Sequence, residues 1–376
     1  MSEKIKVGIT HGDINGVGYE IIARSLGHND ITDIYTPVIF GYPEFLGNAI
    51  QTAGIEDLSF KVISSTEKIE NGRINLVKLH GPMPALQPGK ITGESGHSAA
   101  EALEAAVDAL KKGQIDVLVT APISKEAIQN DKFLFPGHTE YLEDRLGNGE
   151  KALMILCDDK LRVALVSTHL PVADIASRIT EENVENTVRM LEKSLRKDFG
   201  IHRPKIAVLS LNPHCGDGGL LGKEENEIII PVIEKLREEG LLVFGPYASD
   251  GFFGNGSHNA FDGVLAMYHD QGLAPFKTIA GQKGVNFTAG LPYVRTSPDH
   301  GTAFDIAWKG EADETSMREA IYKAIDIFRN RKIYEEISRD PLKITPPERH
   351  EKVERHDKGF RLDQKSDNME LKPEEI

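Results

Sequence analysis

Three apolar runs of strand length, each followed by a histidine, constrain the fold more than any other feature of this sequence. They end at His169, His214 and His269, in the segments LRVALVSTHLP, KIAVLSLNPHCGDGG and FDGVLAMYHDQGLAPFK. Short apolar runs bounded by turn-forming residues are typical of strands buried in a parallel sheet. Ligands of such sheets bind outside the carboxyl ends of the strands. The recurrence therefore predicts one site that brings three imidazole rings together.

Helical patterns separate these runs. Thr180 is expected to cap one helix, and a second is expected over 224–239. Nearer the N-terminus, Ser98 is expected to open a helix with Glu101 completing a capping box, and a short helix is expected over 302–307. Strands that alternate with helices predict an α/β fold with a mostly parallel sheet covered by helices.

Composition and charge narrow the class of protein. The 376 residues are 40% hydrophobic and 27% charged, which suits one or two globular domains. The formal net charge of −14 argues against binding to nucleic acid or to an anionic membrane. The sequence shows no signal-peptide core and no apolar stretch long enough to span a bilayer, and its two cysteines form no CxxC motif. A cytoplasmic protein with reduced cysteines is therefore expected.

The three histidines suit a divalent metal ion. Zinc and similar ions accept neutral imidazole, and three histidines leave a coordination position open for substrate. Asp217 and Asp270 lie close enough in sequence to orient the rings of His214 and His269. The intervals between the histidines match no local metal motif, however, and a single histidine at a strand end is more often a hydrogen-bonded structural residue. From spacing alone, both interpretations stay open.

Several groups near the same predicted sheet edge suit an anionic ligand. Lys277 and Arg295 are cations, and His138 and Thr139 stand at a predicted helix start, where backbone N–H groups and the helix dipole attract phosphate. The alternative is that these side chains are ordinary surface charges. A small phosphorylated or carboxylated substrate is the favoured interpretation. The glycine-rich loop at residues 11–18 matches neither GxGxxG nor the P-loop, so no cofactor-binding residues are assigned.

Seven segments, in order along the chain, resemble the 4-hydroxythreonine-4-phosphate dehydrogenase family of pyridoxine biosynthesis. They are GDINGVGYEI, APISKEA, FPGHTEYLE, STHLP, LNPHCGDGGLLGKEE, YHDQGLAPFK and GVNFTAGLPYVRTSPDHGTAFDIA. The resemblance covers residues 5–330. It departs from the family pattern at Ile14 and Asn15, where Pro and Ala are usual, and at Ser124, where Asn is usual.

The resemblance implies a fold similar to isocitrate and isopropylmalate dehydrogenases, with two α/β/α lobes, mostly parallel sheets and an active site in the cleft between the lobes. The first lobe would be discontinuous, formed by 1–130 and 288–335, and the second would comprise 131–287 with the metal-binding histidines. Residues 345–376 have few large apolar side chains and mixed charges, so they are expected to form a mobile tail.

The activity implied by the resemblance is NAD-dependent oxidation of the C3 hydroxyl of 4-phosphooxy-L-threonine, in pyridoxal 5'-phosphate biosynthesis. The product, 2-amino-3-oxo-4-(phosphooxy)butanoate, is a β-keto acid that decarboxylates to 3-amino-2-oxopropyl phosphate. The resemblance also implies one divalent ion per site, Zn, Mg, Co or Mn, held by His169, His214 and His269. It implies a homodimer in which His269 comes from the neighbouring subunit.

The substrate contacts implied by the resemblance are His138, Thr139, Lys277, Asn286 and Arg295. The general base stays open among Lys277, Asp270 and a metal-bound water. The physiological metal and the preference between NAD and NADP are also not fixed by the sequence.

Two alternatives remain. One is a paralogous dehydrogenase of D-threonate or D-erythronate 4-phosphate that uses the same metal chemistry. The other belongs to a different class, a metal-dependent phosphate-ester binding protein or hydrolase without redox activity. Comparing turnover of the two kinds of substrate distinguishes the first alternative from the biosynthetic enzyme. NADH formation distinguishes a dehydrogenase from the second alternative.

Overall fold

The computed structural model describes residues 4–27, 30–129, 133–135 and 137–340. The expected mobile tail, 345–376, lies outside the described residues. The compact unit discussed below ends at Ile337. In the described part of the chain, no helix is long and apolar enough to cross a membrane.

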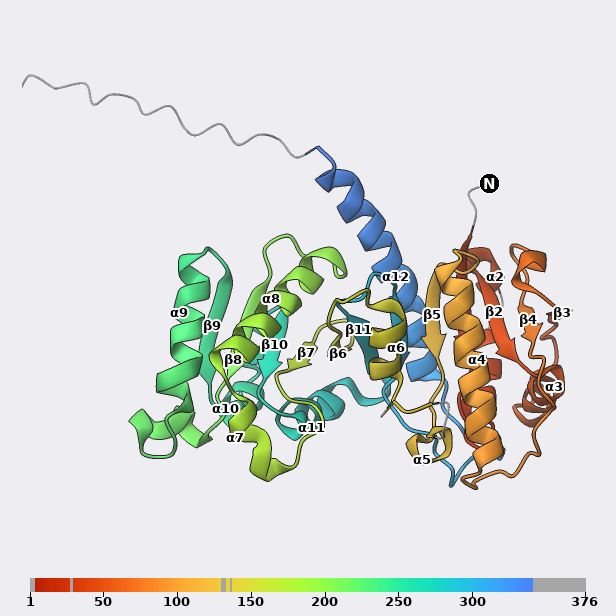
Figure 1. Cartoon of the computed structure of the whole chain (residues 1–376), viewed down its shortest axis with the longest axis horizontal. Helices are drawn as coiled ribbons and strands as arrows, with labels where there is room; N and C mark the ends of the chain where they lie inside the picture. Colours follow the sequence, from red (N-terminus) through yellow and green to blue (C-terminus); the bar gives the residue numbers. More distant parts are fainter. Residues whose placement is uncertain (1–3, 28–29, 130–132, 136, 341–376) are drawn as a thin grey trace, which may run out of the picture. The chain divides into compact units, whose positions relative to one another are not determined.

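The strands form one 12-stranded sheet in the order β3-β4-β2-β1-β5-β12-β11-β6-β7-β10-β8-β9 (Figure 1). One run of parallel strands comprises β1 (Ile5–Thr10), β2 (Tyr35–Gly41), β3 (Lys61–Ile63), β4 (Asn75–Lys78), β5 (Val117–Thr120) and β12 (Arg295–Pro298). A second run comprises β7 (Arg162–Leu165), β8 (Lys205–Leu209), β9 (Leu242–Tyr247) and β10 (Gly263–Ala266). Between the two runs lie β6 (Leu153–Cys157) and β11 (Val285–Ala289).

The central pairings are antiparallel. Strand β11 runs antiparallel to both β12 and β6, and β6 runs antiparallel to β7. The expected α/β fold with a mostly parallel sheet is confirmed, and the antiparallel pairings that make the sheet mixed were not expected. The chain leaves the first run after β5 and returns to it as β12, which pairs with β5. The assignment of 1–130 with 288–335 and of 131–287 to separate lobes stays a prediction.

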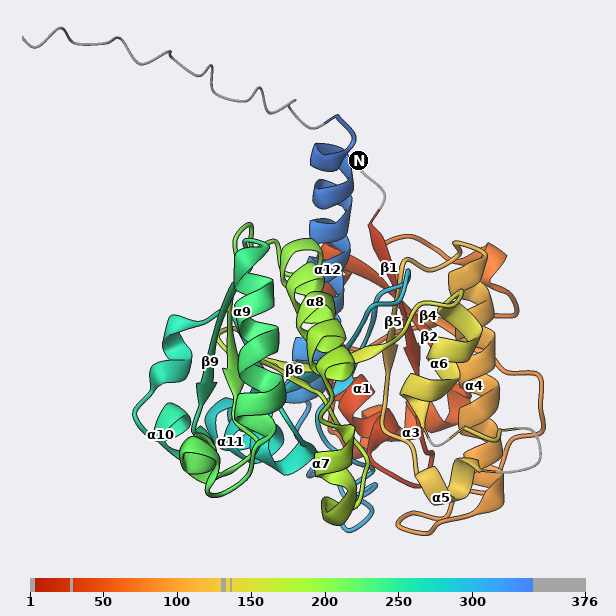
Figure 2. The same ribbon diagram turned by 60° about the vertical axis from the view of Figure 1, so that its left-hand side comes forward.

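The helices cover the sheet in positions that follow from their apolar faces (Figures 1 and 2). The helices are α1 (Gly18–Leu26), α2 (Ile31–Ile34), α3 (Pro43–Thr52), α4 (Gly93–Lys111), α5 (Lys125–Ile128), α6 (His138–Leu146), α7 (Ile175–Arg178), α8 (Glu181–Lys197), α9 (Ile230–Glu238), α10 (Ser249–Gly254), α11 (His269–Ala280) and α12 (Thr315–Ser338). Helix α4 contacts β1, β2 and β5, whereas α8 and α9 lie side by side over the second run.

Alternating residues of the second run enter two different hydrophobic clusters, because successive side chains of a strand point to opposite faces. Ala164 joins the large cluster that includes Val188 of α8. Its neighbour Val163 joins a smaller cluster with Phe276 of α11. Both faces of this part of the sheet are therefore covered, which explains why the sequence shows continuous apolar runs rather than a polar–apolar alternation.

Three expected helices compare with the structure as follows. Helix α8 begins after Thr180, whose hydroxyl accepts a hydrogen bond from the Asn183 N–H at 3.2 Å, as predicted. The expectation that Ser98 opens a helix is wrong, because α4 already begins at Gly93, where the Thr92 hydroxyl provides the cap. The region 224–239 contains a π-helical turn at Glu225–Ile229 followed by α9.

The helix expected over 302–307 is absent, and this segment consists of loop and turns. The residue that follows the segment, Trp308, is held by distant partners. The Trp308 N–H donates to the Glu20 carboxylate at 2.8 Å, and the Trp308 indole N–H donates to the Ile14 carbonyl at 2.8 Å. Ala303 adopts a left-handed φ of 44°, which interrupts a right-handed helix.

A buried ion pair connects α12 to the end of α8. The Arg331 guanidinium donates to the Asp198 carboxylate at 2.6 Å, and the two side chains are 8% and 3% exposed. Arg331 also donates to the carbonyls of Leu291 and Pro292. The Ser194 hydroxyl donates to the second carboxylate oxygen of Asp198 at 2.7 Å. This buried arginine is therefore fully compensated by a carboxylate, which makes it a useful reference for the site described next.

Candidate active site

The three strands that precede the predicted metal-binding histidines are neighbours in the sheet. They lie in the order β7-β10-β8 and are parallel, so the loops after them emerge at one edge. His169 follows β7, and His269 begins α11 after β10. Adjacent strands are about 4.8 Å apart, and the ring centroids of His169 and His269 lie 6.2 Å apart. His269 Nδ1 lies 2.7 Å from an Asp270 carboxylate oxygen, so Asp270 orients this ring.

The third histidine stands on a strained turn after β8. His214 and the four residues after it all have left-handed backbones, with φ of 52°, 53°, 76°, 43° and 65°. This conformation costs about 1–2 kcal/mol for each residue that is not glycine. Among the described residues of one chain, no group of three or more His, Cys, Asp or Glu side chains could hold a metal ion. One chain therefore brings His169 and His269 together but does not complete the predicted triad.

The buried carboxylate of Glu225 holds this turn in place. Glu225 is 1% exposed and accepts hydrogen bonds from the backbone N–H groups of Leu211 and Asn212 at 2.8 and 2.7 Å. A Cβ added to Gly216 would lie 2.7 Å from the same carboxylate. Strained backbone persists only where its surroundings over-determine it, and it clusters at functional sites. The exposed His214 is thus presented on a fixed turn.

A cavity of about 250 Å³ contains most of the predicted substrate contacts. It is formed by the loop after β5, the first turn of α6, β11, β12 and the loop after β12. The predicted residues that line it are His138, Thr139, Asn286, Arg295 and His169. Lys277 is not among the lining residues, because its ammonium group binds Asp299, with 3.1 Å to both the side-chain and the backbone oxygen.

Sheet twist explains how one cavity collects residues from both runs of strands. Three antiparallel pairings separate β5 from β7, so the two strands point in opposite directions by topology. Nevertheless Pro122, after β5, and His169, after β7, line the same cavity. Each pair of neighbouring strands is rotated by roughly 20–25°, and this rotation accumulates across β12, β11 and β6. The twist therefore turns the two carboxyl edges towards each other.

Arg295 is a buried cation without an ion-pair partner. It is 2% exposed and donates to the hydroxyl of Thr120 at 2.6 and 3.2 Å and to that of Thr288 at 3.0 Å. Among the described residues, no carboxylate forms an ion pair with it, in contrast to Arg331. Burial lowers the pKa of Arg295 to about 9, and the negative charge of Glu140 partly opposes this shift. The guanidinium is thus charged at neutral pH but uncompensated, which favours an anionic ligand.

Other polar groups of the cavity also lack partners. Burial, together with the charges of Arg295 and Lys125, holds the pKa of His138 well below its usual range, so its imidazole is neutral at physiological pH. Its Nε2 and the side-chain oxygen of Asn286 are buried without a hydrogen-bond partner. Gly137 precedes α6 and provides no side-chain cap for the first turn. Buried polar atoms are normally hydrogen-bonded, so these groups indicate a site for a polar ligand.

The sequence interpretation missed three charged or titratable residues of the cavity. They are Lys125, Glu140 and His300. Lys125 and His300 stand shortly after the ends of β5 and β12, and Glu140 stands in the first turn of α6. The rule that polar residues after strand ends approach the ligand would have found Lys125 and His300.

A second cavity, of about 290 Å³, adjoins the first, and His300 lines both. Its apolar wall consists of Val17, Ile21, Ala303, Ile306 and Ala312. Its polar residues are Gln282, Asp299, Asp313 and Ser316. An apolar cleft with a few polar groups at its rim suits a flat aromatic ring that carries polar substituents.

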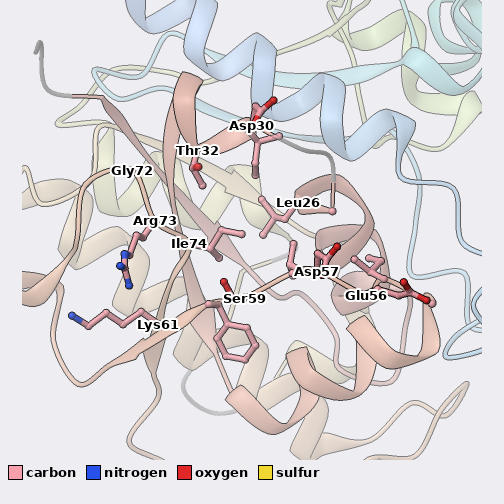
Figure 3. A pocket seen from close by; sticks show the side chains of 16 residues that line it. Leu26, Asp30, Thr32, Glu56, Asp57, Ser59, Lys61, Gly72, Arg73 and Ile74 are labelled. Carbon is pink, nitrogen blue, oxygen red and sulfur yellow. The ribbon is translucent and has the colours of Figure 1, made fainter.

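The largest of the described cavities lies elsewhere, near β3 and the ends of α1 and α3 (Figure 3). Its volume is about 840 Å³. Lys61 and Arg73 lie on one side of it, and Glu56 and Asp57 lie on the other. None of the predicted site residues lines it. Size alone therefore does not identify the functional site of this protein.

Comparison with known proteins identifies the family of this chain. The family described as "Pyridoxal phosphate biosynthetic protein PdxA" matches residues 33–324. A 4-hydroxythreonine-4-phosphate dehydrogenase of Bacteroides thetaiotaomicron is 50% identical over 340 residues, which cover 90% of this chain and 93% of the relative. A D-threonate 4-phosphate dehydrogenase of Cupriavidus necator is 40% identical over 329 residues, which cover 86% and 98%.

Solved structures give the same result. The crystal structure of a 4-hydroxythreonine-4-phosphate dehydrogenase from Klebsiella pneumoniae superposes with a TM-score of 0.75 at 33% identity, covering 87% of this chain and 98% of that one. The resemblance inferred from the seven sequence segments is confirmed. Because the relatives are named as dehydrogenases, an oxidoreductase is supported. The chain belongs to the family of the pyridoxal phosphate biosynthetic protein PdxA.

Proposed function

We propose that this protein catalyses the NAD-dependent oxidation of the C3 hydroxyl of 4-phosphooxy-L-threonine. The hydroxyl carbon loses a hydride to NAD and the oxygen loses a proton, giving 2-amino-3-oxo-4-(phosphooxy)butanoate. This β-keto acid then loses CO2 to give 3-amino-2-oxopropyl phosphate. The relative that shares half of its residues with this chain is named for this substrate, and the chemistry of the cavity fits it.

The observation that carries the proposal is the uncompensated charge of Arg295. The guanidinium faces a cavity that also contains Lys125 and the uncapped first turn of α6. A phosphate or carboxylate group placed there would receive charge-assisted hydrogen bonds from the guanidinium fork and from backbone N–H groups. His138 and Thr139 would bind the same end of the substrate. Fixing the anionic groups orients C3 for the transfer of its hydrogen.

The second cavity suits one ring system of the nicotinamide cofactor. Val17, Ile21, Ala303 and Ile306 would pack against a flat ring, while Asp313 and Gln282 would bind its polar edge. Because His300 lines both cavities, a cofactor held here would reach the substrate. NAD, when bound, supplies the hydride acceptor that the reaction needs.

A divalent ion, Zn, Mg, Co or Mn, would be held by His169, His214 and His269. It would supply a Lewis acid that lowers the pKa of the hydroxyl and polarises the ketone. The donor set fits, because His169 and His269 are neighbours and His214 stands on a strained, fixed turn. Since one chain does not complete the triad, we propose that a second copy of the chain completes it in a homodimer.

A second candidate function is the oxidation of D-threonate 4-phosphate. It is favoured by the relative of that name, which is 40% identical. This compound carries a hydroxyl where 4-phosphooxy-L-threonine carries its amino group, so both molecules present the same anionic groups to Arg295.

The direct test of the proposed function is turnover by the purified protein with NAD and a divalent ion. NADH formation is followed by its near-ultraviolet absorbance. We expect kcat/KM with 4-phosphooxy-L-threonine to be at least about tenfold above that with D-threonate 4-phosphate, because a site that binds a charged amino group discriminates against a neutral hydroxyl. The reverse ratio would assign the paralogous function. Absence of NADH with both substrates would contradict a dehydrogenase of either kind.

The proposed role of the Arg295 charge can be tested without an activity assay. Replacing Arg295 by Met removes an uncompensated buried charge, so the free energy of unfolding of the ligand-free protein should rise by about 1–2 kcal/mol. The rise in melting temperature that inorganic phosphate gives the wild type should disappear. Arg331→Met is the matched control, because it strands the Asp198 carboxylate and should cost about 3–5 kcal/mol while keeping the phosphate effect. An Arg295→Met protein less stable than the wild type would contradict the assignment.

The shared metal site predicts complementation between inactive variants. Mixed dimers should be prepared from His169→Ala with His269→Ala, and separately from His169→Ala with His214→Ala. If His269 crosses between subunits, the first mixture should recover about one quarter of wild-type activity, since half of the dimers are hybrids with one intact site of two. If His214 crosses, the second mixture should recover instead. Hybrids confirmed by mass that stay inactive in both mixtures would rule out a shared site.

A further inference from the structure

We propose that Glu140 binds the α-ammonium group of the substrate and thereby selects an amino acid over the 2-hydroxy acid of the same skeleton. This inference rests on the proposed function, because it concerns the same cavity. It assigns the choice between the two candidate substrates to one side chain.

The charges of the cavity single out Glu140. Lys125 and Arg295 supply positive charge to the cavity wall. Glu140 is the one acidic residue among the described residues that line it. A phosphorylated amino acid carries two anionic groups and one cationic group. The cations of the wall match the two anionic groups, and Glu140 matches the ammonium group.

The Glu140 carboxylate is free to bind a ligand. The side chain is partly buried, and among the described residues it forms no hydrogen bond or ion pair. Glu140 lines the same cavity as Arg295 on β12 and His169 after β7. Burial lowers the pKa of Arg295, and the negative charge of Glu140 partly opposes that shift. Glu140 thus shares the cavity with the proposed anion-binding guanidinium and with a predicted metal ligand, so it would lie near the C2 substituent of a short substrate.

Helix capping is the ordinary role for a glutamate at this position, and the geometry does not show it. Glu140 is the third residue of α6, where a capping-box carboxylate accepts a hydrogen bond from the N–H of the residue before the helix. That residue is Gly137, and the described residues show no hydrogen bond between its N–H and Glu140. A Cβ added to Gly137 would lie 3.4 Å from the carboxylate, so the group lies over the helix start without capping it.

The unpartnered oxygen of Asn286 discriminates less strongly between the two substrates. The side-chain oxygen of Asn286 is buried and unpartnered among the described residues, but it is neutral and can accept from either a hydroxyl or an ammonium group. A negative charge gives the ammonium group a larger advantage, because hydrogen bonds to charged groups contribute about 1.5–3 kcal/mol. Glu140 is therefore the residue that sets the specificity.

The test compares two substrates that differ in one group. 4-Phosphooxy-L-threonine and D-threonate 4-phosphate have the same carbon skeleton and configuration, with an amino group or a hydroxyl at C2. Glu140→Gln keeps the size of the side chain and removes its charge. We expect kcat/KM for the amino acid to fall about tenfold to a hundredfold, while kcat/KM for the hydroxy acid changes by less than about threefold. Glu126→Gln, in the neighbouring exposed segment and outside the cavity, should leave both values unchanged.

Binding of both compounds, measured by calorimetry with the wild type and with Glu140→Gln, separates this inference from the proposed function. A wild type that binds the amino acid, loses this preference in Glu140→Gln and forms no NADH would overturn the proposed function and leave the role of Glu140 intact. Equal losses for both compounds would show that Glu140 only supports α6. Unchanged binding and turnover of both would also overturn the inference.

Discussion

The buried guanidinium of Arg295 is the constraint on which the rest of the site depends. Two threonine hydroxyls hold it, Thr120 at the end of β5 and Thr288 on β11, and no carboxylate of the described residues neutralises it. Arg331, which is also buried, has Asp198 as its partner. The fold therefore carries a charge that lowers its own stability and raises its affinity for an anion. A buried, uncompensated charge of this kind is expected at a binding site, where affinity for a ligand offsets the loss of stability.

The sheet topology places that charge. Because β12 returns from the C-terminal part of the chain to pair with β5, Arg295 enters the sheet beside Leu118. The antiparallel strands β11 and β6 then connect the two parallel runs, and their twist brings the loop of His169 to the cavity of Arg295. His300, just after β12, joins this cavity to the apolar one beside it. A charged substrate and an aromatic cofactor ring would thus meet at a single residue.

Much of this could be predicted from the sequence, and the failures have physical causes. The strand-end histidines could be recognised because each follows an apolar run. The antiparallel pairing of β6 and β11 could not be predicted, because a buried strand shows the same apolar run whichever direction it takes in the sheet. The helix expected over 302–307 failed because Trp308 bonds to Glu20 and Ile14, far away in sequence. Lys277 pairs with Asp299 and does not line the cavity, so its predicted contact with the substrate stays a prediction. The left-handed turn at His214 depends on Glu225, which no local pattern reveals.

The central claim is that an uncompensated buried cation selects a phosphorylated substrate. The most direct measurement is the ratio of kcat/KM, with NAD, for 4-phosphooxy-L-threonine and for 4-hydroxy-L-threonine, which lacks only the phosphate. Two charge-assisted hydrogen bonds of about 1.5–3 kcal/mol each predict a ratio of roughly a hundred to ten thousand in favour of the phosphate ester. Comparable values for the two compounds would contradict the claim, because the anion site would then contribute nothing to recognition.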